Sequence, residues 1–151
     1  MSYLLDTCIV SELSKKRPDK AVLAWLSSVA ESDLYVSSLT IAEIRSGIER
    51  FDETDRRRAR LESWYENIAS LLNRRIVPFD HLMAVEWGRI VGNSFRSGRV
   101  KPGMDMLIAA TAKSRNMTLV TRNTKDMEGV GVELLNPFEF QSNEMNRRRE
   151  E

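Results

Sequence analysis

Two acidic residues stand in apolar surroundings, where an unpaired charge is unfavourable. Asp6 directly follows an apolar run and precedes Ile9 and Val10. Asp105 lies in the segment 104–116, where the residues three, four and seven positions later are apolar, so in a helix it would share their stripe. A buried carboxylate without a cationic partner is costly, and we see no such partner beside either residue. A bound metal cation would offset that cost.

Asp105 and Glu43 each also have a purely structural explanation. Asp105 would stand in the first turn of its helix, where the peptide dipoles favour an anion. Glu43 follows Thr40 by three residues, the spacing of a capping box. Gly47, four residues beyond Glu43, favours a functional role, because a helical glycine costs about 1 kcal/mol and indicates that something approaches the helix closely.

Asn123 and Asp126 complete a set of oxygen ligands, although both also suit an ordinary turn. The chain has one histidine, His81, and one cysteine, Cys8, so a zinc site of Cys and His is nearly excluded. We expect Cys8 to be a core residue and His81 a surface or capping residue. Sites made only of oxygen select Mg²⁺ or Mn²⁺, which activate water for phosphodiester hydrolysis without a protein nucleophile.

The elements that position these residues alternate between strand and helix. Apolar runs indicate short strands, and 3.6-residue periodicity indicates the helices between them. This alternation predicts a three-layer α/β/α fold with a mainly parallel, roughly five-stranded sheet. Asp6 and Asn123 then lie at carboxyl ends of strands, where ligands bind in open α/β sheets. The strands are expected at 3–5, 34–38, 75–79, 118–123 and 132–140, and the helices at 7–16, 20–30, 40–51, 58–73, 81–98 and 104–116.

Length and composition indicate one ordinary globular domain. The 151 residues, 42% apolar and 30% charged with a net charge of +1, fit a single domain at 1–140 and a polar tail at 141–151. No run approaches the roughly 20 apolar residues of a membrane span, and no signal peptide is visible. We therefore expect a cytoplasmic protein with no membrane partner.

A basic segment leads into Asp105. Arg96, Arg99 and Lys101, with Arg122 further along the chain, are candidates for contacts to RNA phosphates, which position a substrate without reading its sequence. The alternative is an ordinary solvated loop.

Several motifs, in this order, resemble the PIN-domain toxins of bacterial toxin–antitoxin pairs, of the VapC type and especially FitB-like members. They are "YLLDTCIVSEL", "SSLTIAEIRSGIE", "RIVPFD", "DMLIAATAKSRNMTLVTRNTKDM" and "VELLNP", which together span residues 3–138. The resemblance implies an endoribonuclease that requires Mg²⁺ or Mn²⁺ and cleaves tRNA or rRNA. It also implies a homodimer, and a cognate antitoxin that forms a hetero-oligomer with the toxin and inhibits it.

Carried over to this chain, the catalytic acids of the family match Asp6, Glu43 and Asp105. The fourth acidic position is Asn123 here, which leaves open whether Asp126 substitutes for it and whether one or two metals bind. This departure favours an alternative: a catalytically weak PIN-like module that acts mainly by binding its antitoxin. A phosphatase with Asp6 as nucleophile would need a second acid two residues on, where Cys8 stands.

Overall fold

The computed structural model describes residues 1–99 and 103–141. Its strands are β1 (Tyr3–Leu5), β2 (Leu34–Ser37), β3 (Ile76–Val77), β4 (Thr118–Val120) and β5 (Leu134–Leu135). Its α-helices are α1 (Thr7–Glu12), α2 (Lys20–Ser28), α3 (Ser38–Glu49), α4 (Arg56–Leu72), α5 (His81–Arg96) and α6 (Met104–Ser114). Short 3-10 turns are η1 (Glu31–Asp33), η2 (Asn73–Arg75), η3 (Lys125–Met127) and η4 (Pro137–Glu139).

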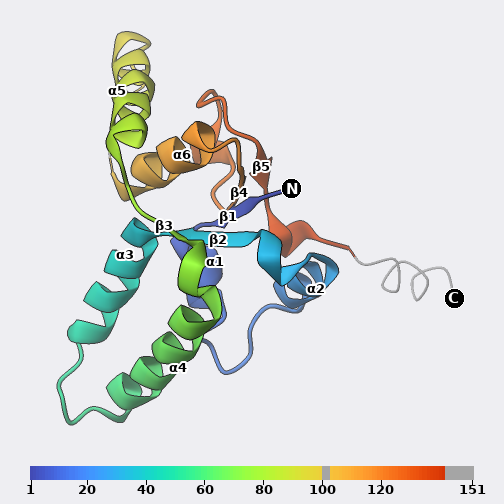
Figure 1. Cartoon of the computed structure of the whole chain (residues 1–151), viewed down its shortest axis with the longest axis vertical. Coiled ribbons are helices and arrows are strands. Elements are labelled where there is room, and N and C mark those ends of the chain that lie inside the picture. Colours follow the sequence, from blue (N-terminus) through green and yellow to red (C-terminus); the bar gives the residue numbers. More distant parts are fainter. Residues whose placement is uncertain (100–102, 142–151) are drawn as a thin grey trace, which may run out of the picture.

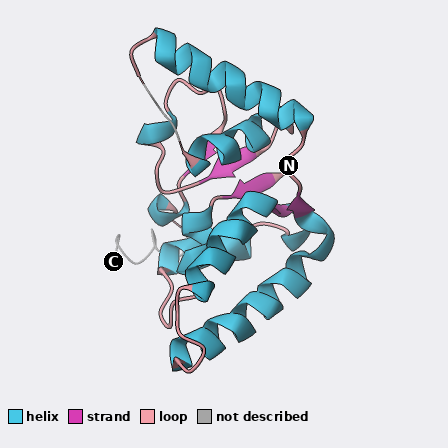
Figure 2. Cartoon of the chain, turned by 90° about the vertical axis from the view of Figure 1, so that its left-hand side faces the viewer, coloured by secondary structure: helices cyan, strands magenta, loops and turns pink. Residues whose placement is uncertain are grey.

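The five strands form one parallel sheet in the order β3-β2-β1-β4-β5. The chain builds outward from β1 to β3 and then crosses to the other side of β1 for β4 and β5, so the strand order reverses between β1 and β4. Helices α1 to α4 lie on one face of the sheet, and α5 and α6 lie on the other (Figures 1 and 2). This arrangement confirms the predicted three-layer α/β/α fold with a five-stranded parallel sheet.

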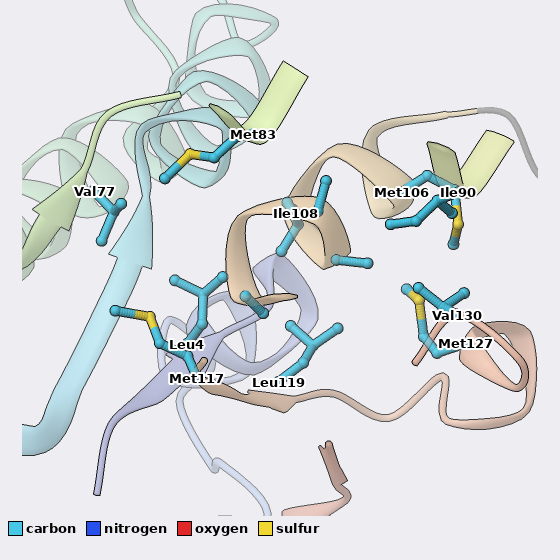
Figure 3. Packing of buried hydrophobic residues seen from close by; sticks show 13 residues of the cluster. Leu4, Val77, Met83, Ile90, Met106, Ile108, Met117, Leu119, Met127 and Val130 are labelled. Carbon is cyan, nitrogen blue, oxygen red and sulfur yellow. The ribbon is translucent and has the colours of Figure 1, made fainter. Parts of the chain in front are cut away.

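Two apolar clusters bind the layers together, one on each face of the sheet. The cluster shown in Figure 3 joins the sheet to α5 and α6, with Leu4 and Leu119 from the strands, Ile108 from α6 and Met83 from α5. The second cluster joins the opposite face to α1 to α4 through residues such as Leu5, Ile9 and Trp25. Burial on both faces explains why the strand residues read as continuous apolar runs.

Four helices start directly after an aspartate whose side chain accepts a hydrogen bond from a backbone N–H of the first turn. These N-caps are Asp6, Asp19, Asp55 and Asp80, at the starts of α1, α2, α4 and α5. An N-cap carboxylate satisfies a donor that the helix itself leaves free. Asp6 therefore has a structural role as well as a candidate chemical one.

The strands at the C-terminal side are shorter than the sequence predicts. β4 ends at Val120, because the N–H of Asn123 bonds to the Thr121 hydroxyl and forms a turn in place of further strand. The predicted strand 132–140 is reduced to β5, because the Asn136 side chain accepts the N–H of Phe138 and Pro137 opens η4. Polar side chains that bind local backbone thus end both strands.

Two predicted features lie outside the described residues: Lys101 and all of the predicted polar tail except Gln141. Among the residues that the structure describes, no helix has the length and apolar character needed to cross a bilayer.

Candidate acidic site at the carboxyl ends of β1 and β4

Asp6 directly follows β1, the central strand, at the carboxyl end of the sheet, and is only 2% exposed. Its backbone N–H donates to the carbonyl of Val120, 2.9 Å away, which continues the pairing of β1 with β4. Its Oδ1 accepts the N–H of Thr7 at 2.8 Å, and its Oδ2 accepts the hydroxyl of Thr121 at 2.8 Å. The buried carboxylate is therefore held by hydrogen bonds on both oxygens, and among the described residues it forms no ion pair.

The register of the sheet explains why Asp6 meets Thr121. Leu5 pairs with Val120 in parallel, so the next residue of each strand reaches the same edge at the same place. This is also the point where the strand order reverses, and ligands of open α/β sheets bind at such points. The sheet places a carboxylate from the start of the chain beside a hydroxyl from its last third.

Glu43 does not belong to a capping box, which corrects one of the two explanations left open above. Helix α3 begins at Ser38, its N-cap is Ser37, and the Ser37 side chain accepts the N–H of Leu39. Thr40 is a buried residue within the helix and not its cap. Glu43 therefore lies in the second turn, where no backbone N–H remains for it to cap.

The Glu43 side chain is instead bound to α1. Its Oε1 accepts the Thr7 hydroxyl at 2.6 Å, and the Thr40 hydroxyl lies 3.1 Å from that of Thr7. Glu43 is half-buried and forms no ion pair within residues 1–99 and 103–141. A structural role at the helix terminus is excluded, and the carboxylate remains available for chemistry.

Within residues 1–99 and 103–141, no protein group makes the close approach to α3 that the helical Gly47 predicts. A Cβ built at Gly47 would have nothing within 4 Å. The glycine instead borders an open pocket of about 230 Å³ between α1, α3 and α4, which Thr7, Glu43 and Trp64 also line. The side of α3 next to Glu43 thus faces open space.

Asp105 enters the same region from α6. It is half-buried in the first turn, after the N-cap Gly103, whose φ of 124° is a conformation that favours glycine. Burial raises the pKa of Asp105, and the negative charges of Asp6, Glu43 and Asp126 raise it further. The charges of these three acids thus act on Asp105 from other elements of the fold. Among the described residues no cation forms an ion pair with Asp105.

The side chains suit a hard cation in type, but they are not gathered around one point. All the candidate ligands are oxygens, and the mutual repulsion at Asp105 is the kind that a dication relieves. Yet no three His, Cys, Asp or Glu side chains in the described parts of the chain lie close enough together to hold an ion as they stand. Mg²⁺ retains several waters, so it requires direct contact with only some of these acids.

Asn123 and Asp126 lie on the loop after β4, and both are exposed. The backbone N–H of Asn123 donates to the Thr121 hydroxyl at 3.1 Å, the same hydroxyl that donates to Asp6. The loop is thus tied to Asp6 through one side chain. Asp126 lies in η3, and its charge reaches Asp105.

Cys8 is less buried than the core position expected of it, whereas His81 lies on the surface as expected. Cys8 is half-buried, with its sulfur 3.7 Å from Asp6 Oδ2, and burial raises the pKa of its thiol. A thiol with a raised pKa stays protonated at neutral pH and is a poor nucleophile. His81 is the exposed first residue of α5, whose N-cap is Asp80.

The basic candidates are dispersed. Arg96 and Arg99 are exposed near the end of α5, and Arg99 lines a polar pocket of about 230 Å³ with Ser94 and Lys113. The Arg122 guanidinium stacks on the Phe138 ring, 3.6 Å from its centroid. None of these three forms an ion pair among the described residues, so their charges remain available to an anionic ligand.

Comparison with known proteins places the chain in a family. The PIN domain model matches residues 3–132, which includes all the candidate acids. The chain belongs to the PIN domain family. It is 34% identical over 136 residues to VapC ribonuclease Y4jK of Sinorhizobium fredii, covering 90% of this chain and 97% of that protein. It is 33% identical over 135 residues to Toxin FitB of Neisseria gonorrhoeae, covering 89% and 97%.

Solved structures agree with this membership in the PIN domain family. The structure of FitAB bound to the IR36 DNA fragment matches with a TM-score of 0.84 and 33% identity, covering 93% of this chain and 99% of that chain. The observed layers, strand order and helices of this PIN domain thus have a close solved counterpart.

Sequence reasoning missed the two threonines that hold the acids. Thr7 stands next to Asp6, and that adjacency was the only signal available for it. Thr121 gave no signal, because its contact with Asp6 joins residues 115 positions apart and depends on the strand register.

Proposed function

We propose that this PIN domain is the toxin of a type II toxin–antitoxin pair and acts as a metal-dependent endoribonuclease on structural RNA, tRNA or rRNA. The observation that carries the proposal is that Thr7 binds both Asp6 and Glu43 while the charges of these two acids act on Asp105. Among the described residues, none of the three acids forms an ion pair. The similarity to a protein named VapC ribonuclease supports the substrate class.

In this proposal Asp6, Glu43 and Asp105 hold Mg²⁺ or Mn²⁺, and Asn123 and Asp126 are further candidate ligands. The bound cation supplies a polarised water as nucleophile and neutralises charge on the scissile phosphate. The hydrogen bonds of Thr7 and Thr121 hold Asp6 in one orientation, because both are donated to its carboxylate. Arg96, Arg99, Lys101 and Arg122 are candidates for contacts to the RNA backbone.

The proposed partners are a cognate antitoxin, the RNA substrate and a second copy of the chain, within a toxin–antitoxin hetero-oligomer in the cytoplasm. The similarity to FitB, which has been solved as FitAB on a DNA fragment, supports the antitoxin partner. The three exposed arginines, free of ion pairs in the described residues, support an anionic substrate.

The test uses Asp105→Asn and Glu43→Gln, because Asp6→Ala would also remove the N-cap of α1. Purified protein with Mn²⁺ should cleave an RNA pool, EDTA should stop cleavage, and each variant should retain about 1% of the rate or less. Asp55→Asn is the matched control, since Asp55 caps α4 and lies outside the site. Cleavage by Asp105→Asn at the wild-type rate would contradict the proposal.

The second candidate is a module of weak catalysis that acts by binding its antitoxin. Asn123 at the fourth acidic position favours it, since an amide binds a dication less strongly than a carboxylate. Under this alternative the wild type cleaves RNA barely above background with saturating Mn²⁺, whereas Asn123→Asp gains activity. A wild-type rate abolished by EDTA and unchanged in Asn123→Asp would reject it.

A further inference from the structure

Thr7 is the one described residue that binds both Asp6 and Glu43. Its backbone N–H donates to Asp6 Oδ1 at 2.8 Å, and its hydroxyl donates to Glu43 Oε1 at 2.6 Å. The two acids come from different elements, one at the end of β1 and the other in the second turn of α3. A single residue at the start of α1 therefore joins the two carboxylates.

The position of Thr7 makes this connection rigid. As the first residue of α1 it has a backbone N–H that the helix cannot use, and that donor goes to Asp6. Its β-branched side chain has few rotamers, which limits the directions that its hydroxyl can take. The neighbouring Thr40 hydroxyl, 3.1 Å away on a fully buried side chain, limits movement on the α3 side.

The contact leaves half of the Glu43 carboxylate unused. Thr7 binds Oε1, whereas Oε2 accepts no hydrogen bond from any described residue. A free glutamate samples many rotamers, and fixing one of its oxygens removes most of that freedom. Groups that orient a metal ligand in this way strongly affect metal affinity.

We propose that Thr7 is a positioning residue, whose hydroxyl fixes Glu43 beside Asp6 so that one divalent cation meets both carboxylates. The inference rests on the proposed metal-dependent function and adds to it a residue that does not itself touch the metal. It predicts that loss of the hydroxyl weakens cation binding through Glu43.

The test compares Thr7→Val, which removes the hydroxyl but keeps the shape and the backbone N–H, with Thr7→Ser, which keeps the hydroxyl. Titration calorimetry with Mn²⁺ alone should show about tenfold weaker binding for Thr7→Val and a change within about twofold for Thr7→Ser. Thr118→Val is the matched control, because Thr118 also donates to a glutamate, Glu133 at 3.3 Å, but at the opposite end of the sheet. It should bind Mn²⁺ like the wild type.

A double-mutant cycle with Glu43→Ala separates positioning from a general loss of structure. If Thr7 acts through Glu43, Thr7→Val should have no further effect on Mn²⁺ affinity once Glu43 is alanine. Equal effects of Thr7→Val with and without Glu43 would overturn the inference. Should Thr7→Val fail to fold, Thr7→Ala against Thr7→Ser supplies the same comparison.

The outcomes distinguish this inference from the proposed function. If the wild type binds Mn²⁺ and loses it in Asp105→Asn, while Thr7→Val matches the wild type, only the role of Thr7 is wrong. If the wild type itself binds no Mn²⁺, both are wrong.

Discussion

For Asp105, a structural and a functional explanation predict opposite effects on the stability of the protein. An acid in the first turn of a helix normally stabilises it. Here burial and three neighbouring acids raise the pKa of Asp105, so its ionised form is disfavoured in the folded protein. A position that costs stability without metal is typical of residues kept for function.

We expect Asp105→Asn to raise the melting temperature of the metal-free protein by about 2–4 °C at pH 7, which corresponds to about 1 kcal/mol in a chain of this size. The folded pKa lies above the ordinary value of 3.8, so the folded state binds the proton more tightly. The stability of the wild type therefore falls as the pH rises from 3.8 through the folded pKa of Asp105. Below pH 3.8 Asp105 is protonated in both states, and the variant loses its advantage. Calorimetric melting from pH 3 to 8 measures this.

Added Mn²⁺ should reverse the order, stabilising the wild type and leaving Asp105→Asn unchanged. If the variant melts below the metal-free wild type at every pH, Asp105 is a helix-stabilising acid and the functional explanation fails for it.

Among the elements, the start of α3 determines whether Glu43 can cap the helix or projects from its second turn. The Ser37 side chain accepts the N–H of Leu39, so the helix starts three residues before the position that a Thr40 cap would require. This shift turns Glu43 from a terminal residue into one that projects from the second turn.

We expect Ser37→Ala to lower the free energy of unfolding by about 1 kcal/mol, because the N–H of Leu39 loses its partner. Ser46→Ala is the control, since Ser46 lies exposed in the middle of the same helix and alanine is a better helix former. Urea denaturation measures both. An unchanged midpoint for Ser37→Ala would mean that the helix is not capped there.

The fold was predictable from the sequence because its strands are buried on both faces and its helices have clear periodicity. The ends of the elements were not, because they depend on side chains such as Asn136 that bind local backbone. Asp6 and Asp105 could be selected from their apolar surroundings. The Thr121 partner of Asp6 could not, since this contact requires the register of two strands far apart in the chain.

For the molecule as a whole, the outer face of α5 is the feature that bears on assembly. Leu82, Val85 and Phe95 are 70%, 40% and 73% exposed. Gly88 and Gly92 are exposed on the same helix, and a Cβ at either would meet nothing within 4 Å. Exposed apolar side chains beside helical glycines favour close packing of another helix, as the proposed homodimer would provide.

We expect Phe95→Asp to weaken the homodimer at least about tenfold, because it places a charge in an apolar interface. Leu71→Asp is the control, since Leu71 is 54% exposed on α4, on the other side of the sheet. Size-exclusion chromatography with light scattering over a concentration series measures both. If Leu71→Asp abolished the homodimer and Phe95→Asp did not, the interface would lie on the layer of α1 to α4 and the expectation would be wrong.

The bond between Asp6 and Thr121 also has a consequence for synthesis. While a ribosome makes this protein, Asp6 emerges early, but Thr121, directly after β4, is translated more than a hundred codons later. The candidate site therefore cannot assemble in a nascent chain, and a product cut short before β4 would carry the first carboxylate without the hydroxyl that holds it.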